Sequence, residues 1–221
     1  DEARNAAATA TLEQGRAEPE AQRGGTQVAV AGVTLTPLPP TLTAVALAVA
    51  DAKVEQDIGL GMADASLRIA EKHNDAALQI ANNLVKQYPD KALSYMSRGL
   101  IYANTNQMDK AIADYDKAIE LDPDFVLAYN NRGNVYNGLK QYAQAIKDFD
   151  KVIALDPTYA SAYSNRGVAY FNLQAYDKAI AHYDKAIEIN PDDALAYTNR
   201  GNVYHDLNQT DKALAALDRA I

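Results

Sequence analysis

The stretch YNNRGNVYNGLKQYAQAIKDFDKVIALDP, residues Tyr129 to Pro157, decides the fold of this 221-residue chain. It contains no residue pattern for catalysis, yet its pattern returns as YSNRGVAYFNLQAYDKAIAHYDKAIEINP, residues Tyr163 to Pro191, with 13 of the 29 residues identical. A chain that repeats a segment of this length is built from copies of one structural unit.

Four series of residues keep the same interval of 34 positions. The series are Pro89, Pro123, Pro157 and Pro191; Gly99, Gly133, Gly167 and Gly201; Tyr95, Tyr129, Tyr163 and Tyr197; and Tyr102, Tyr136, Tyr170 and Tyr204. Four series in one register do not arise by chance. A repeat of this period predicts a solenoid, in which each unit buries apolar surface against its neighbours.

Each unit is predicted to hold two helices. Ala111, Tyr115 and Ala118 recur at helical steps and form one apolar stripe. Pro123 cannot stand in mid-helix, so it ends one pair and suits the first turn of the next. Gly99 has no side chain and lets the second helix approach closely.

These residues resemble the tetratricopeptide repeat family, whose pattern is an aromatic residue, Leu-Gly, Tyr, Ala, an aromatic residue and Pro. The copies here read Tyr95, Arg98-Gly99, Tyr102, Ala111, Tyr115, Pro123; then Tyr129, Arg132-Gly133, Tyr136, Ala145, Phe149, Pro157; then Tyr163, Arg166-Gly167, Tyr170, Ala179, Tyr183, Pro191. The resemblance implies an all-α, right-handed superhelical α-solenoid. It predicts about four units over residues 89–221 and a degenerate first unit over residues 55–88, in which Ala65, Ala77 and Leu84 take the glycine and alanine positions.

Arginine stands where the family pattern has leucine before the glycine. The positions are Arg98, Arg132, Arg166 and Arg200. One interpretation is structural: the alkyl stem packs between repeats while the guanidinium pairs with Asp114, Asp116 or Asp148. The other is a basic ladder for an acidic ligand.

The resemblance also implies that the first helix of each pair lines a concave face. The candidate binding residues on it are Asn131, Asn134, Asn137, Asn165, Asn199, Asn202 and His205. Their side chains donate and accept hydrogen bonds, which suits an extended partner peptide. The alternative is that they satisfy one another and water. The family's basic clamp for a C-terminal carboxylate needs lysines, but positions 96, 130, 164 and 198 carry Met, Asn, Ser and Thr, which disfavours a chaperone-tail adaptor.

Residues 1–54 have a different composition, with no charged side chain between Gly24 and Ala50. Alternating apolar residues predict an extended, β-like segment: Val28, Val30, Val33, Leu35, Val45, Leu47 and Val49. Residues 42–49 also fit helical spacing. A secretory segment or a disordered linker is an alternative for this head.

An uncharged, strand-like head and a repeat array that stops inside a helix together predict head-to-tail assembly of copies, as an extracellular fibre subunit. The alternative is a soluble adaptor that binds a partner peptide in its concave groove. We expect an extracellular or cell-surface location, with the cytoplasm or periplasm as the alternative. Candidate glycosylation sites are Thr34, Thr36, Thr41, Thr43 and Asn208.

Several function classes are disfavoured. The net charge of −8 argues against nucleic acid as a partner, because phosphate binding requires a basic surface. Cysteine is absent, and the three histidines lack zinc-ligand spacing, so we expect no metal and no cofactor. Prolines interrupt the apolar head, so we expect no membrane span. No residue pattern indicates an enzyme.

Overall fold

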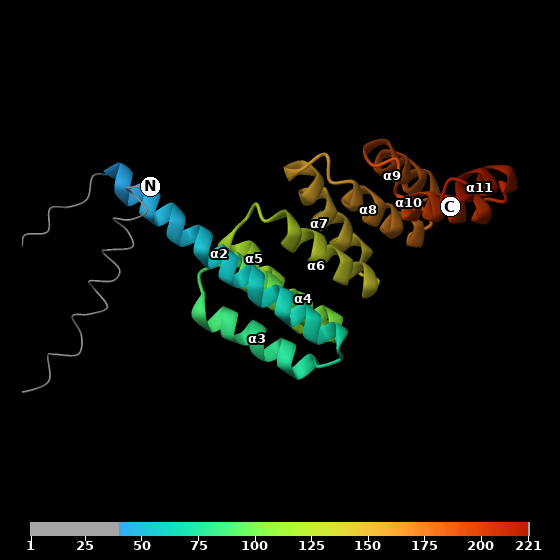
Figure 1. Ribbon diagram of the computed structural model, residues 1–221. Helices are drawn as coiled ribbons and strands as arrows, with labels where there is room; N and C mark the ends of the chain where they lie inside the picture. The colour runs from blue at the N-terminus through green and yellow to red at the C-terminus, as the bar shows by residue number, and fades with distance from the viewer. Residues whose placement is uncertain (1–39, 221) are drawn as a thin grey trace, which may run out of the picture. The chain divides into compact units, whose positions relative to one another are not determined.

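The computed structural model describes residues 40–220, with side chains described from residue 51. This range consists of ten helices and no strand (Figure 1). They are α2 (Pro40–Ala70), α3 (Asn74–Gln87), α4 (Ala92–Asn104), α5 (Met108–Leu121), α6 (Val126–Gly138), α7 (Tyr142–Leu155), α8 (Ala160–Asn172), α9 (Tyr176–Ile189), α10 (Ala194–Asp206) and α11 (Thr210–Leu217). The all-α fold is therefore confirmed.

The chain divides into two compact units, Asp1–Gln56 and Asp57–Ile221. In the first unit, the described part is the helical segment from Pro40. The predicted boundary between residues 54 and 55 falls inside α2. In the second unit, helices follow one another in antiparallel pairs.

The β-like prediction for Val45, Leu47 and Val49 is wrong, because these residues lie within α2. The apolar residues of this stretch fit both the strand period and the helical period. Alanine is the best helix former, and Pro40 occupies the first helical position, where its missing N–H costs nothing. The other predicted strand residues, Val28, Val30, Val33 and Leu35, lie outside the described residues.

Each helix pair turns through one residue with a left-handed backbone. These residues are Lys72, Asn106, Lys140, Gln174 and Asn208, with φ between 56° and 62°. In the α4–α5 turn, the Gln107 N–H donates to the Tyr102 carbonyl and the Asn106 N–H donates to the Ala103 carbonyl. This is the Schellman arrangement, which satisfies the last carbonyls of the first helix and reverses the chain.

Within a pair, a glycine lies against an aromatic ring. A Cβ added at Gly99 would stand 2.7 Å from Tyr115 Cε1, and one added at Gly133 would stand 2.8 Å from Phe149 Cε1. Gly167 meets Tyr183 in the same way, at 2.7 Å. All three rings are buried, so the glycine interval reflects close helix packing.

The first helix pair, α2 and α3, has side chains of different size at the positions of the glycine and the aromatic ring. Ala65 of α2 and Ala81 of α3 are both buried, and they share a cluster with Ala77 and Ile101. Here alanine replaces glycine and a second alanine replaces the large ring. Small side chains therefore fill the interior between α2 and α3, and this cluster also contacts Ile101 of α4.

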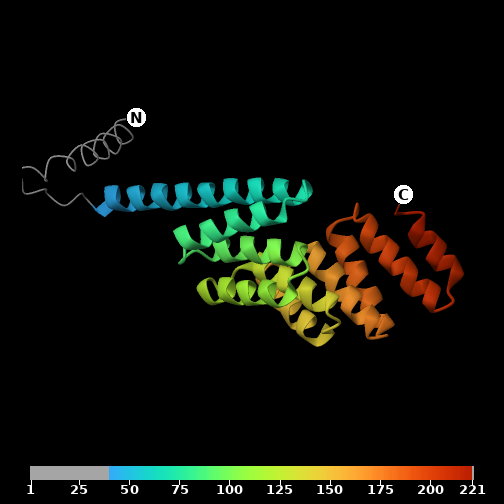
Figure 2. The same cartoon turned by 90° about the horizontal axis from the view of Figure 1, so that it is seen from below.

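The second helix of each pair packs on the first helix of the next, from α3 on α4 to α9 on α10. The first helices α4, α6, α8 and α10 also contact one another in sequence, whereas no comparable contact joins successive second helices among the described residues. First helices are thus the more closely spaced, and the stack curves toward them. Figure 2 shows the same pairs a quarter turn away.

Candidate interaction site

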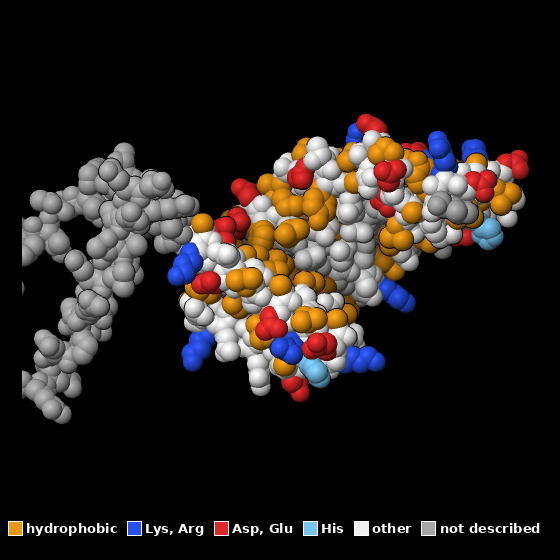
Figure 3. All heavy atoms as spheres, in the orientation of Figure 1, with side chains coloured by type: hydrophobic (Ala, Val, Ile, Leu, Met, Phe, Trp, Pro, Cys, Tyr) orange, Lys and Arg blue, Asp and Glu red, His pale blue; other side chains and the backbone are white. Residues whose placement is uncertain are grey.

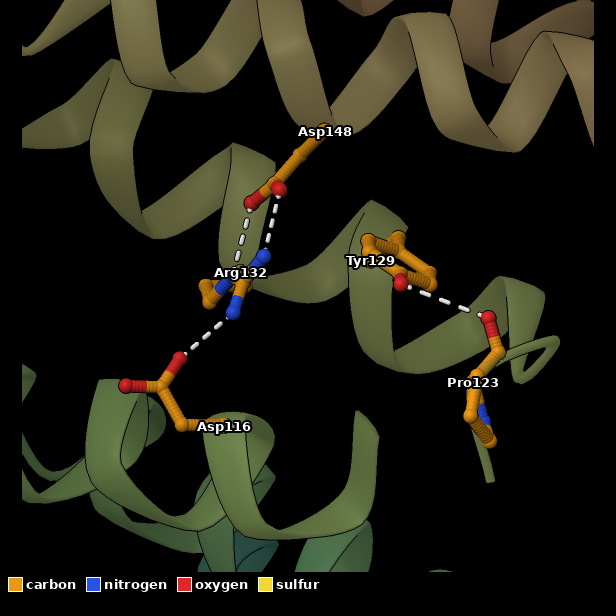
Figure 4. Close-up of polar contacts among 5 residues, drawn as sticks. All are labelled: Asp116, Pro123, Tyr129, Arg132 and Asp148. Atoms are coloured by element: carbon orange, nitrogen blue, oxygen red, sulfur yellow. Dashed lines mark hydrogen bonds and ion pairs between the residues drawn. The ribbon is translucent and has the colours of Figure 1, made fainter. Parts of the chain in front are cut away.

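A ladder of ion pairs runs through the stack where the family pattern has leucine. The arginine ladder comprises Arg98, Arg132, Arg166 and Arg200 with their acceptors. Arg132 is the complete case: its Nε and Nη2 donate to the Asp148 carboxylate at 2.9 and 2.6 Å, and its Nη1 donates to Asp116 at 2.5 Å (Figure 4). One guanidinium therefore joins the second helix of its own pair to that of the preceding pair.

Arg98 repeats this geometry with one change. It makes two 2.7 Å bonds to Asp114, and its Nη1 reaches Asn82 at 3.2 Å. The hydrogen bond to Asp114 raises the pKa of Arg98 further, although burial opposes the charge. The ion pairs predicted with Asp114, Asp116 and Asp148 are all present, which supports the structural interpretation of these two arginines.

The ladder loses acidic partners toward the C-terminus. Arg166 pairs with Asp150, but its Nη2 meets His182 Nδ1 at 3.3 Å instead of a carboxylate. Burial, together with the positive charge of Arg166, lowers the pKa of His182 to about 4. Arg200 pairs with Asp184 at 2.5 Å, and the other position is held by Ala216.

Each guanidinium of the ladder lies over one or two tyrosine rings. Arg132 lies 5.5 Å from the centre of the Tyr129 ring and 5.9 Å from that of Tyr136, distances at which cation–π attraction operates. The Tyr129 hydroxyl donates to the Pro123 carbonyl at 3.3 Å, which ties the ring to the turn before its helix (Figure 4). The tyrosine and proline series thus serve the same packing arrangement.

Three of the predicted binding residues lie between neighbouring first helices. Asn131 Nδ2 contacts Met96 Sδ at 3.8 Å, and Asn165 Nδ2 donates to Asn130 Oδ1 at 3.4 Å. Asn137 Nδ2 donates to the Asn165 carbonyl at 3.0 Å. These amides contact residues of the neighbouring repeat, while Asn137 Oδ1 is buried without a hydrogen-bond partner in the described part of the chain. Asn199 is half-buried on the equivalent position of α10.

The remaining predicted residues face solvent. Asn134, Asn202 and His205 are exposed, and the His205 side chain is 84% accessible. Beside them lie two exposed leucines that sequence reasoning missed, Leu127 at 42% and Leu195 at 68%. They stand two repeats apart at one register position, and that spacing is the signal that would have found them. We call Leu127, Asn134, Leu195 and Asn202 the inner face.

The first helices carry almost no charge. In α4, α6 and α8 the arginine of the ladder is the single charged residue, and α10 adds Asp206. Figure 3 shows one side of the molecule, where hydrophobic and uncharged side chains gather over α6 and its neighbours and charged ones lie around them. A surface of leucines and amides can hold an extended backbone and apolar side chains.

The lysine clamp for a C-terminal carboxylate is not formed at its register positions. Met96, Asn130 and Ser164 are buried, and the Thr198 hydroxyl donates to the Ala194 carbonyl at 2.9 Å. None of the four side chains is positively charged.

Other chemistry finds no support in the described part of the chain. No group of three or more His, Asp or Glu residues there is placed to hold a metal ion. None of the helices between residues 40 and 220 combines the length and apolar character that a membrane span requires. Asn208 is exposed in the α10–α11 turn. Thr34 and Thr36 lie outside the described residues, and the side chains of Thr41 and Thr43 in α2 are not described, so glycosylation stays a prediction.

The fold and its contacts define an α-solenoid of helix pairs, and comparison with known proteins identifies the family. Models described as tetratricopeptide repeat match residues 160–193 and 182–215, and one described as TPR repeat matches residues 99–140 and 133–174. The matches run from residue 99 to residue 215, more than half of the chain. The chain belongs to the tetratricopeptide repeat family, as predicted.

Solved structures agree. A crystal structure of MamA is 26% identical, covers 71% of this chain and 91% of its own, and has a TM-score of 0.62. A MamA fragment from Desulfovibrio magneticus RS-1 is 21% identical, covers 74% and 93%, and has a TM-score of 0.64. The first TPR of Spaghetti (RPAP3), bound to the HSP90 peptide SRMEEVD, is 32% identical, covers 53% and 94%, and has a TM-score of 0.52. No curated protein matches the chain.

Proposed function

We propose that this chain is a non-enzymatic interaction scaffold that binds an extended segment of a partner protein along its inner face. The observation that carries the proposal is the character of that face: exposed leucines and amides on first helices whose arginines face their ion-pair partners. A neutral surface of this kind suits a peptide with apolar side chains, whose backbone the amides Asn134 and Asn202 can bind.

A solved relative supports this class of ligand. The RPAP3 repeat, 32% identical over about half of this chain, carries a bound HSP90 peptide. That peptide, SRMEEVD, is acidic, and the equivalent face here has no lysine clamp. We therefore expect a different, more apolar peptide on the inner face of this chain.

Head-to-tail assembly and a location outside the cell stay predictions. Strand addition by residues 45–49 no longer fits, since they are helical, and residues 28–35 lie outside the described residues. No contact in the described residues supports a polymer over a peptide-binding scaffold.

The test selects peptides from a displayed random library on the 221-residue chain and measures their affinities by fluorescence anisotropy. A double variant, Leu127→Arg with Leu195→Arg, should weaken the selected peptides tenfold or more, because it places charge on the neutral face. The control is Leu173→Arg, a leucine in the α8–α9 turn whose exposure of 51% lies between those of Leu127 and Leu195. SRMEEVD should bind weakly or not at all. If the double variant keeps full affinity, the inner face is not the binding site.

A further inference from the structure

The last repeat lacks the acid that the α4–α5 and α6–α7 repeats use to complete the arginine ladder. Sixteen residues after each arginine stand Asp114, Asp148, His182 and Ala216 in turn. The first two bind the Nε and Nη2 edge of the guanidinium with both carboxylate oxygens, and His182 meets Nη2 with a ring nitrogen. At Ala216 there is nothing to accept these hydrogen bonds.

A pocket of about 340 Å³ opens at this position. Its lining includes Tyr197, Arg200, Tyr204, Lys212, Ala216 and Arg219. Three of its lining residues are cations and none is an acid, in a chain whose net charge is −8. We call it the Arg200 pocket.

Arg200 is already oriented for a ligand. Its Nη1 is held by Asp184, and its ring contact with Tyr197 places the guanidinium 5.3 Å from the ring centre. Its Nε is buried without a hydrogen-bond partner in the described structure, as is the Nε of Arg166, but beside Arg166 the ring of His182 fills the space that Ala216 leaves open. A buried donor of this kind loses its hydration and gains nothing in return, so a matching acceptor binds there favourably.

We infer that the Arg200 pocket binds a carboxylate, supplied by an acidic side chain of a partner protein. The chain itself shows the complementary group, because Asp148 occupies the equivalent space beside Arg132 with two bonds of 2.9 and 2.6 Å. A planar carboxylate matches the paired N–H groups of a guanidinium edge. Lys212, whose Nζ lies 5.4 Å from the Tyr204 ring centre, adds a second positive charge at the rim.

This site is separate from the inner face. The pocket is formed by Tyr197, Arg200 and Tyr204 of α10 with α9 and α11, whereas the inner face uses Leu195 and Asn202 of α10. Failure of the peptide groove would leave the Arg200 pocket intact, and the two sets of variants do not overlap. A partner that uses both would place an acidic residue beside an apolar segment.

The test follows the side-chain Nε–Hε signals of Arg132 and Arg200 by nuclear magnetic resonance in the 221-residue chain. The probe is a capped peptide, acetyl-Gly-Gly-Asp-Gly-Gly-amide, and the neutral control has Asn in place of Asp. We expect the Asp peptide to shift the Arg200 signal saturably, in the millimolar range usual for one charged fragment. The Arg132 signal, whose edge is already occupied, should not move.

Two variants test the space beside the Nε and Nη2 edge of each arginine, which Asp148 fills at Arg132 and Ala216 leaves open at Arg200. Ala216→Asp supplies the missing carboxylate from within the chain, so the Arg200 signal should move toward that of Arg132 and stop responding to the peptide. Asp148→Ala removes the carboxylate beside Arg132, so the Arg132 signal should now shift when the Asp peptide is added. Circular dichroism shows whether each variant is folded, and Ala216→Asp decides the matter if Asp148→Ala unfolds.

Several results would overturn the inference. If the Arg200 signal does not shift with the Asp peptide, or still shifts in Ala216→Asp, the Arg200 pocket is not a carboxylate site. An equal shift from inorganic phosphate shows a site for anions in general. A peptide with neutral side chains and a free C-terminal carboxylate should bind several-fold more weakly, because its backbone must enter beside Tyr197 and Tyr204; stronger binding would make a chain terminus the ligand.

Discussion

The repeat formed by α6 and α7 and the repeat formed by α10 and α11 share one backbone plan but differ in what completes it. In the first, Gly133 meets the buried ring of Phe149, and Arg132 is held by Asp148 and Asp116. In the second, Gly201 meets Leu217, which is 37% exposed, and Arg200 is held by Asp184 alone. The helix-pair arrangement therefore tolerates an incomplete interior, and the incomplete repeat is the one that offers a site.

The largest effect should come from removing the acid of the complete repeat. Asp148→Ala leaves the Arg132 Nε buried and unpaired, and losing one partner of a buried ion pair costs about 3 kcal/mol of unfolding free energy. Urea unfolding followed by circular dichroism measures it. Asp116→Ala is the control, because Asp116 is 54% exposed and should cost less than about 1 kcal/mol. If the two variants lost the same free energy of unfolding, the burial of Asp148 would not make its ion pair stronger than that of Asp116.

The second effect compares the two glycines. Gly133→Ala places a Cβ 2.8 Å from Phe149 Cε1 in a buried contact, and overpacking costs up to about 3 kcal/mol. Alanine recovers about 1 kcal/mol of helix propensity, so we expect a net loss of about 2 kcal/mol. Gly201→Ala meets Leu217 Cγ at 3.1 Å, and this half-exposed side chain can move, so its stability should stay nearly unchanged. A large loss for Gly201→Ala would show that the last repeat is packed as rigidly as the middle one.

The smallest effect concerns the histidine that replaces the ladder acid in the α8–α9 repeat. Burial and the charge of Arg166 lower the pKa of His182 to about 4, while Asp150 opposes this and Lys178 adds to it. An unfolded histidine titrates near 6.5, so between these values the unfolded chain binds more protons. The contribution of His182 to the free energy of unfolding is thus fully present above pH 6.5 and is lost as the pH falls through 4.

This loss can be measured against a variant that does not titrate. Because His182 is partly exposed, we expect the wild type to lose about 1 kcal/mol more than His182→Gln between pH 7 and pH 4. Thermal unfolding at several pH values provides the comparison. Parallel pH profiles for the two proteins would rule out the expected burial of the ring.

Much of the fold was predictable because the same sequence pattern recurs in several copies of the repeat. The interval between Gly99, Gly133 and Gly167, and the helical step from Ala111 to Tyr115, each follow from packing rules that act locally. The secondary structure around Val45 was not predictable, because its apolar residues fit both the strand period and the helical period. This stretch occurs once in the chain, so no second copy distinguishes the two. The left-handed residues such as Lys140 were missed because lysine is not a usual choice for that conformation.

By itself, then, the amino-acid sequence determined the family, the 34-residue unit, the helix pairs and the acids that pair with Arg98 and Arg132. The tertiary structure decided which side chains remain available. Asn131 and Asn165 look like Asn134 in the sequence, yet both are half-buried and contact neighbouring helices of the stack. Ala216 looks like an ordinary helix residue, and only the stacking of α9, α10 and α11 shows that it leaves the Arg200 Nε without an acceptor. The reason is physical: a repeat specifies what each position packs against on average, whereas an unsatisfied donor arises from the particular neighbours that surround it.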